Sequence, residues 1–156
     1  MTQKRKLPPR AKRAYAFSEM TPALQEAARQ IEEDCRVTNR KQVLRAHAIG
    51  QQLEDIATDP ISYGLYGTEQ ITKFFPGAEV TEQLRQMRKV AAVFSRDFVS
   101  KQSATPTPGG RLLEFGHFAA LADIESEDVR LTILHLIRTK DLTVAQTYRL
   151  IADMAG

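Results

Sequence analysis

Hydrophobic residues recur at three- and four-residue spacing along most of the chain, a pattern that predicts helices. A first helix is expected over residues 22–36, where Thr21 provides an N-cap and Pro22 fits the first helical position. A second helix is expected over residues 39–56. Gly50 lies inside it, and because an interior glycine costs about 1 kcal/mol relative to alanine, we expect close contact with another helix there. No strand-like alternation of useful length occurs, so the sequence predicts an all-α, multi-helical fold.

Two stretches rich in turn-forming residues interrupt this helical pattern. Residues 57–67 are expected to form a loop, followed by a short helix over residues 68–75 with Thr68 as its cap. A longer helix is expected from residue 81 to residue 98. Residues 103–110 contain two prolines and two glycines and predict a linker between two small helical lobes. The hydrophobic stripe of the longer helix comprises Leu84, Met87, Ala91, Phe94 and Phe98.

The last third of the chain predicts three further helices. An apolar helix is expected over residues 112–121, and a second over residues 126–139 with Ser126 as its cap. After a turn at residues 140–142, Thr143 and Gln146 have the spacing of a capping box at the start of the terminal helix. A helix-turn-helix unit has this layout, and so does any pair of packed helices with a short turn. In the terminal helix we expect three buried side chains, Val144, Tyr148 and Ile151.

The formal charge of +3 is unevenly distributed along the chain. Residues 1–13 contain six basic and no acidic residues, which leaves 16 basic and 19 acidic residues for the remainder. We therefore divide the chain into a basic disordered arm (1–20), an N-terminal helical lobe (21–102), a linker (103–110) and a helix-turn-helix-like C-terminal lobe (111–156).

Composition predicts a soluble protein of the cytoplasm. Hydrophobic residues make up 42% and charged residues 26% of the chain, which is ordinary for a globular domain. The longest apolar run, residues 90–94, is far shorter than the ~20 residues of a membrane-spanning helix, so no membrane association is expected. Prolines at positions 8 and 9 interrupt the place where a signal peptide has its apolar core. Cys35 is the only cysteine, which excludes an intrachain disulfide and favours a reducing compartment.

The sequence contains no recognisable catalytic or metal-binding constellation. His47, His117 and His135 have no further ligands at helical spacing, so we expect no metal site. Cys35 lies on an apolar stripe and is expected to be a buried thiol. None of the eight lysines has an acidic residue two positions before it, which excludes the metal-dependent active site of restriction-type nucleases. We therefore expect no enzymatic activity and no cofactor.

Two clusters of basic residues are candidates for phosphate contacts. On the predicted longer helix, Arg85, Lys89 and Arg96 fall within about 40° of one another at ~100° per residue. Arg88 lies beside them, although a solvated helix face would have the same pattern. The arm supplies the second cluster, which would follow phosphates or a minor groove, bind an acidic protein or aid solubility: Lys4, Arg5, Lys6, Arg10, Lys12 and Arg13.

The C-terminal helix pair offers base contacts if it is a helix-turn-helix unit. Such units present the first residues of their second helix to the major groove, so Gln146 and Thr147 would read bases and Arg149 would bind a phosphate. Residues 111–156 carry five basic and seven acidic residues, however, and this balance favours plain helical packing. Both interpretations stay open.

Five short motifs follow one another between residues 40 and 151. They are Ala48-Ile49-Gly50-Gln51-Gln52-Leu53, Tyr66-Gly67-Thr68-Glu69-Gln70-Ile71, Leu84-Arg85-Gln86-Met87-Arg88-Lys89 before Phe94 and Phe98, Leu113-Glu114-Phe115-Gly116-His117-Phe118, and Leu142-Thr143-Val144-Ala145-Gln146-Thr147-Tyr148-Arg149-Leu150-Ile151. Their order resembles the helical N-terminal domain that precedes the nuclease domain in YhcG-like members of the PDDEXK superfamily.

This resemblance implies a recognition and oligomerisation domain without the part that cuts. Such domains are associated with DNA-modifying and mobile-element systems. The chain departs from the family at Phe115 and Gly116, where the family has Trp-Ser. The nuclease domain would follow Ile151, and the sequence stops at Gly156.

From these features we expect a non-enzymatic, accessory or regulatory protein that binds DNA. The alternative is a protein-interaction module. In that case the hydrophobic stripe of the longer helix, together with Phe115 and Phe118, would form a homodimer interface or dock a separate effector such as a nuclease.

Overall fold

The computed structural model describes residues 17–37, 42–75 and 78–155. All regular secondary structure in these ranges is helical, which confirms the predicted all-α class. A 3-10 turn, η3 (Phe17–Glu19), precedes the α-helices. In chain order these are α1 (Pro22–Val37), α2 (Val43–Ala57), α3 (Pro60–Tyr63), α4 (Gly67–Phe74), α5 (Ala78–Val93), α6 (Arg96–Ala104), α7 (Phe115–Ala122), α8 (Glu127–Lys140) and α9 (Val144–Ala155).

The caps predicted for α1, α8 and α9 are present. Thr21 and Ser126 each accept a hydrogen bond from the backbone N–H three residues on, at 3.2 and 3.3 Å. At α9 the Thr143 hydroxyl accepts from the Gln146 N–H at 3.1 Å, and the Gln146 side chain accepts from the Thr143 N–H at 2.9 Å. These local signals were sufficient to predict the three helix starts, because each cap forms its hydrogen bonds within four residues of the helix start.

The predicted loop at residues 57–67 contains a short helix, α3, which Asp59 caps through the Ser62 N–H at 3.2 Å. The cap predicted at Thr68 is wrong. Helix α4 begins one residue earlier, after Tyr66 in a left-handed conformation (φ 59°), and the Thr68 hydroxyl donates to the Leu53 carbonyl at 3.3 Å. The side chain is therefore used for contact between α2 and α4.

The predicted helix over residues 81–98 is two helices, α5 and α6. In a continuous helix the Phe98 N–H would donate to the Phe94 carbonyl. Here the Ser95 hydroxyl accepts the Phe98 N–H at 3.1 Å, while the ring Nε2 of His47 bonds the Phe94 carbonyl at 2.8 Å. A cap and a tertiary contact thus replace one helical hydrogen bond, and the chain turns. Helix α5 also begins at Ala78 rather than Thr81.

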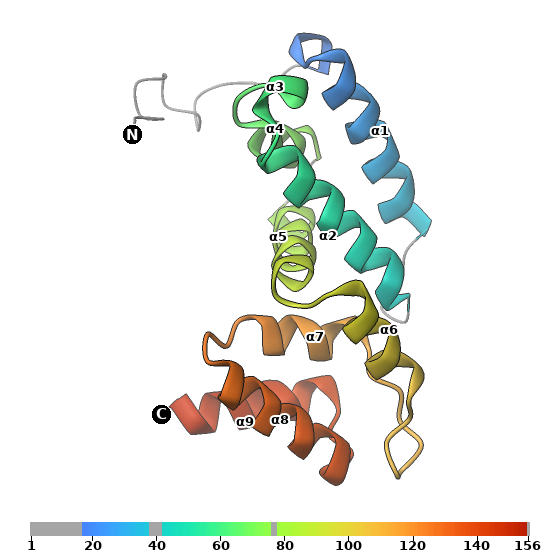
Figure 1. The fold of residues 1–156 in the computed structure, drawn as a ribbon, viewed down its shortest axis with the longest axis vertical. Helices are drawn as coiled ribbons and strands as arrows, with labels where there is room; N and C mark the ends of the chain where they lie inside the picture. The colour runs from blue at the N-terminus through green and yellow to red at the C-terminus, as the bar shows by residue number, and fades with distance from the viewer. Residues whose placement is uncertain (1–16, 38–41, 76–77, 156) are drawn as a thin grey trace.

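Buried hydrophobic residues form two core clusters. The first cluster joins α1, α2, α4 and α5. The second joins α7, α8 and α9, and it also includes Val43, Val90, Phe94 and Val99 from the part of the chain before the predicted linker. Figure 1 shows α6 at the junction between the two groups of helices. Hydrophobic residues from before and after segment 103–110 therefore pack in one cluster. The division into two lobes stays a prediction.

Gly50 marks the close helix contact that the sequence predicted. A Cβ atom at this position would overlap the backbone carbonyl of Met87, so α2 and α5 pack almost backbone to backbone. Gly116 has a similar role between α7 and α9, because its Cβ would lie 2.7 Å from a methyl carbon of Val144. Packing against Val144 thus explains the glycine at position 116, where the family that the chain resembles has serine.

Candidate binding surface

Two of the arginines predicted on or beside a basic helix face, Arg85 and Arg88, are held by carboxylates. Arg85 forms two hydrogen bonds with Glu82, at 2.9 and 2.7 Å, and lies 3.7 Å from Asp123. The hydrogen bonds and charge of Glu82 raise the pKa of Arg85, and Arg85 in turn lowers the pKa of Glu82. Arg88 bonds Glu54 of α2 at 2.6 Å. Phosphate would have to compete with these partners.

Lys89 and Arg96 are exposed, but they do not continue one helix face. Arg96 is the first residue of α6, beyond the break at Ser95. The three side chains expected on one face and Arg88 beside them are therefore two arginines paired with carboxylates and two exposed cations on different helices. The six basic residues predicted in the arm lie outside the described residues.

The residues predicted to read bases are positioned by the cap and core of α9. Gln146 is exposed, yet its side-chain oxygen Oε1 accepts the Thr143 N–H in the capping box. Thr147 is completely buried and its hydroxyl donates to the Thr143 carbonyl at 2.8 Å, so no base could reach it in this structure. Arg149 is exposed. Of this set, Arg149 and the amide nitrogen of Gln146 are available for contacts.

The buried face of α9 is rotated relative to the prediction. Tyr148 is 41% exposed, whereas Thr147, one residue earlier, is fully buried. Val144 packs against Gly116 of α7, and the hydroxyl of the buried Thr147 donates to the Thr143 carbonyl. Burial raises the pKa of Tyr148, and the nearby charge of Asp123 raises it further. Hydrophobicity alone placed the buried face of α9 wrongly, because Thr147 on that face is polar.

The hydrophobic stripe proposed for an alternative interface is not on the surface. Leu84, Met87, Phe94 and Phe118 are buried in the two core clusters. Phe98 is half-buried and stacks on Phe94, with ring centroids 5.1 Å apart. Any protein-binding surface must therefore lie elsewhere, because these side chains already contact one another within the chain.

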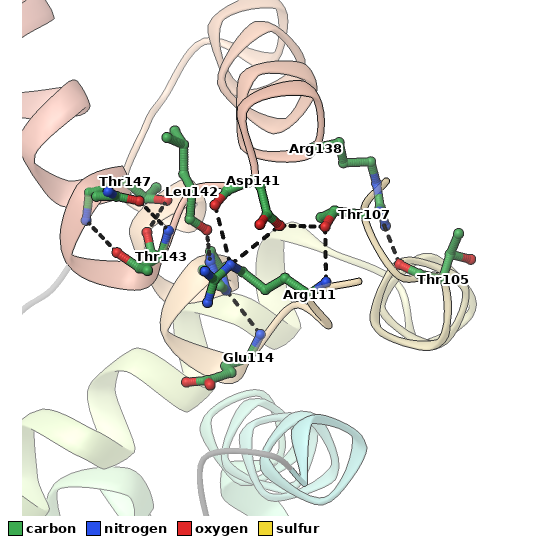
Figure 2. A network of polar contacts seen from close by, with 11 residues as sticks. Thr105, Thr107, Arg111, Glu114, Arg138, Asp141, Leu142, Thr143 and Thr147 are labelled. Carbon is green, nitrogen blue, oxygen red and sulfur yellow. Dashed lines mark hydrogen bonds and ion pairs between the residues drawn. The ribbon is translucent and has the colours of Figure 1, made fainter. Parts of the chain in front are cut away.

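Asp141 ties the predicted linker to the turn between α8 and α9 (Figure 2). It adopts a left-handed conformation (φ 55°), and its carboxylate accepts a hydrogen bond from the buried Thr107 hydroxyl. Arg111 approaches the same carboxylate at 3.4 Å and donates to the Asp141 carbonyl at 3.3 Å. Gly109 lies so close that a Cβ there would contact the carboxylate at 2.5 Å. The loop is thus anchored by one acidic residue.

Arg138 holds the start of the same loop. It donates to the Gln102 side chain at 2.6 and 2.9 Å and to the Gln102 carbonyl at 2.7 Å. A further hydrogen bond joins it to the Thr105 carbonyl at 2.9 Å, as Figure 2 shows. Burial lowers the pKa of Arg138. The guanidinium is already hydrogen-bonded to protein groups and is therefore not a free phosphate ligand.

His117 connects the start of α7 to the same turn. Its Nδ1 accepts the Glu114 N–H at 2.9 Å, and therefore its Nε2 carries the hydrogen that the Leu142 carbonyl accepts at 2.9 Å. Burial lowers the pKa of His117, which favours this neutral form. The histidine is structural, as the sequence predicted for an isolated histidine.

An apolar groove of about 310 Å³ lies between α8 and α9. Val129 is 37% exposed there and Met154 is 53% exposed. A second depression of about 310 Å³, between the α5–α6 corner and α8, includes the charged side chains Glu127 and Arg130 in its lining. The first groove has no charged lining residue; it is formed by Ile124, Val129, Ile133, Ile151, Met154 and Ala155. It is the most apolar concave surface among those described.

The described part of the chain contains no cluster of candidate metal ligands. Within residues 17–37, 42–75 and 78–155, no three histidine, cysteine or carboxylate side chains are placed to share a metal ion. Cys35 is half-buried rather than buried as predicted, and this burial raises the pKa of its thiol, which opposes formation of the reactive thiolate. None of the helices in these ranges combines the length and hydrophobicity that a membrane span requires.

No family model, curated protein or solved structure matches the chain. The resemblance to the YhcG-like domain therefore stays a prediction. Sequence reasoning also missed the α8–α9 groove, because its lining comes from α8, α9 and the turn before α8 and forms only when these segments pack.

Proposed function

We propose that this protein is a non-enzymatic binding module that docks a partner protein in the groove between α8 and α9. The supporting observation is the apolar lining of that groove, in which Val129 and Met154 are left partly exposed beside buried Ile133. Large hydrophobic side chains around a concave surface favour protein contacts, because a partner can remove them from water. A protein-interaction module was the alternative predicted from the sequence, and the surface proposed for it is now the α8–α9 groove rather than the hydrophobic stripe of the longer helix.

The test is to isolate the full chain from its native host together with its bound proteins. We expect a companion protein that is retained by the wild type, lost by Met154→Gln and retained by Leu112→Gln. Leu112 is a matched control, since it is 54% exposed against 53% for Met154 and lies outside the groove. If the three forms carry the same companions, or none, the proposal is wrong.

DNA binding is the second candidate. It is supported by the exposed cations Lys89, Arg96 and Arg149 and by the six basic residues of the arm. It ranks second because Arg85 and Arg88 already have carboxylate partners. Gel-shift binding across a salt series tests it: the affinity should be highest at low salt, and no binding at about 50 mM salt would exclude it.

A further inference from the structure

We infer that the depression between the α5–α6 corner and α8 binds a small amphiphilic carboxylic acid, a molecule with an apolar ring and a carboxylate on a short chain. This site is separate from the α8–α9 groove, since no residue lines both. Arg130 and Glu127 supply its charged side chains. The apolar part of its lining comes from the end of α5, the corner, α6, α7 and α8, and it consists of Val93, Phe94, Phe98, Leu121, Leu131 and Leu134.

The aromatic wall of the depression is held in place by contacts within the protein. Phe94 and Phe98 stack with ring centroids 5.1 Å apart, and Phe118 meets Phe94 edge-on at 6.0 Å. The Ser95 hydroxyl fixes the corner by accepting the Phe98 N–H at 3.1 Å. His47 bonds the Phe94 carbonyl at 2.8 Å. A wall that is already fixed favours binding, because a ligand does not have to order it.

The size and hydrophobicity of the depression fit a ring with a short chain. Its volume is about 310 Å³. An engineered cavity of ~150 Å³ accepts a benzene ring, so a ring and a chain of about three carbons have room here. Leu131 is 51% exposed at this site, and a ligand that covers it removes apolar area from water. An aromatic ring is favoured over an aliphatic body, because it can also stack against phenylalanine.

Arg130 provides the polar contact that selects the head group. Its Nη1 donates to the Ile124 and Glu125 carbonyls at 2.6 and 3.2 Å, which fixes the guanidinium beside the depression. Within the described ranges, no residue forms a hydrogen bond or an ion pair with its Nε or Nη2. The N–H groups on this side form a fork that matches the two oxygens of a carboxylate. The side chain is half-buried, which reduces solvent screening of such a pair.

The charge of Arg130 is not neutralised inside the protein, unlike that of Arg85 and Arg88. Those two arginines are paired with carboxylates, whereas Arg130 is held by uncharged carbonyls. Glu127 lies three residues before Arg130, yet no ion pair joins the two among the residues that the structure describes. The fork is therefore available to an external carboxylate.

Glu127 does not select a cationic ligand instead. It is exposed and lies in the first turn of α8, where the helix dipole stabilises a carboxylate. Its position thus has a local explanation, whereas the unused fork of Arg130 has none within the described chain. We expect Glu127 to weaken the binding of an anion slightly, and this effect can be measured.

The test titrates the full chain with hydrocinnamate by isothermal titration calorimetry. We expect a Kd of roughly 0.1–1 mM, as is ordinary for a ligand of this size. The uncharged analogue hydrocinnamyl alcohol should bind about tenfold more weakly at low salt, because it loses the charge-assisted hydrogen bonds. Propionate, which lacks the ring, should not saturate the site. Absence of saturable hydrocinnamate binding below about 10 mM would overturn the inference.

Variants of the chain show whether the acid occupies this depression. Leu131→Gln should weaken hydrocinnamate binding about fivefold. The matched control Leu112→Gln should not, since Leu112 is 54% exposed against 51% for Leu131 and lies outside the depression. Arg130→Lys keeps the charge and removes the fork, so it should reduce the preference for the acid over the alcohol. Circular dichroism confirms that each variant is folded. Binding that neither Leu131→Gln nor Arg130→Lys changes would contradict the assignment.

Glu127→Gln tests the sign of the head group. Removal of this negative charge should tighten hydrocinnamate binding about twofold at low salt, and about 1 M salt should cancel the gain. L-phenylalanine, which adds an ammonium group, should bind no more tightly than hydrocinnamate. Tighter binding of phenylalanine that Glu127→Gln abolishes would show that the site takes a zwitterion, and the inference would be wrong.

The outcomes also separate this inference from the proposed docking function. Met154→Gln alters only the lining of the α8–α9 groove, so hydrocinnamate affinity should stay within about twofold of the wild type. Hydrocinnamate binding that Met154→Gln abolishes would place the ligand in that groove and overturn the inference. If hydrocinnamate does not bind and companion proteins still depend on Met154, the inference is wrong and the docking function stands.

Discussion

The helix pairs α2–α5 and α8–α9 are both amphipathic, but they are packed very differently. Between α2 and α5 the backbones approach so closely at Gly50 that no side chain fits, and the surrounding stripe is fully buried. Between α8 and α9 the side chains are held apart, and an open apolar groove remains. The first pair also packs against α1 and α4, whereas the second pair packs chiefly against α7 among the described helices.

This difference indicates where stability and binding are located. A stripe that contacts helices on several sides is removed from water completely and contributes to folding. A stripe with fewer neighbouring helices keeps part of its hydrophobic area exposed to water. This exposure lowers the stability of the fold only slightly, and the exposed area is available to a partner. The comparison can be tested by substitutions in each pair and in the polar contacts that join the C-terminal helices to the loop.

The largest effect is expected at Gly50. Helix propensity alone predicts that Gly50→Ala stabilises α2 by about 1 kcal/mol. Because the new Cβ would overlap the Met87 carbonyl, we expect instead a net loss of about 2–3 kcal/mol in the free energy of unfolding, measured by urea denaturation. Ala48→Gly, at an exposed position of the same helix, is the control and should cost about 1 kcal/mol. A stabilised Gly50→Ala would contradict the close packing.

A smaller loss is expected when the loop contacts of α8 are removed. Arg138→Ala deletes the hydrogen bonds to Gln102 and Thr105, and should lower the free energy of unfolding by about 1–2 kcal/mol. Lys140→Ala, an exposed position in the same last turn, should change it by less than about 0.5 kcal/mol. Equal effects of the two substitutions would show that the Arg138 contacts do not stabilise the loop.

The next prediction concerns pH. Because burial lowers the folded-state pKa of His117 below the ordinary value of about 6.5, the unfolded chain takes up a proton first as the pH falls. This contribution to stability is complete above about pH 6.5 and is lost as the pH falls from there through the folded-state pKa. His117→Gln should remove that part of the pH dependence of the melting temperature, whereas His135→Gln, at an exposed position of α8, should retain it.

The charged groups near His117 do not reverse this sign. Glu114 raises the pKa of the ring and Arg111 lowers it, and both effects are smaller than burial. A wild-type protein whose melting temperature between about pH 7.5 and 5 matches that of His117→Gln would contradict a neutral, buried His117.

The smallest effect on stability is expected in the α8–α9 groove. Met154→Ser should change the free energy of unfolding by less than about 0.5 kcal/mol, since the side chain is 53% exposed. A loss comparable to that at Gly50 would mean that the groove is part of the core. In that case the contrast between the two helix pairs would disappear.

The sequence predicted most reliably what depends on neighbouring residues. Thr21, Ser126 and the Thr143–Gln146 box were identified correctly because a cap involves only the first turn of its helix. Gly50 was identified because glycine within a helix needs a packing reason. The break at Ser95 was missed although its cap is local, because the hydrophobic spacing continues from Phe94 to Phe98 and the contact of His47 with the Phe94 carbonyl is formed only in the fold.

The candidate site was less predictable for the same reason. Arg85 and Arg88 have the spacing of a basic helix face, but Arg85 pairs with Glu82 three residues before it, and Arg88 pairs with Glu54 of α2. Thr147 is polar, as a surface residue would be, and yet it is fully buried. Charge pairing and burial between distant segments follow from how helices pack, and a one-dimensional pattern does not contain that information.

By itself, therefore, the sequence determined that the chain is helical, where several helices begin, and that a close helix contact occurs at Gly50, since propensity, capping and periodicity act over one or two turns. The tertiary structure decided that Arg88 is paired with a carboxylate, which face of α9 is buried, and that an apolar groove remains at α8–α9. These features depend on side chains that are distant in sequence and meet only when the helices pack.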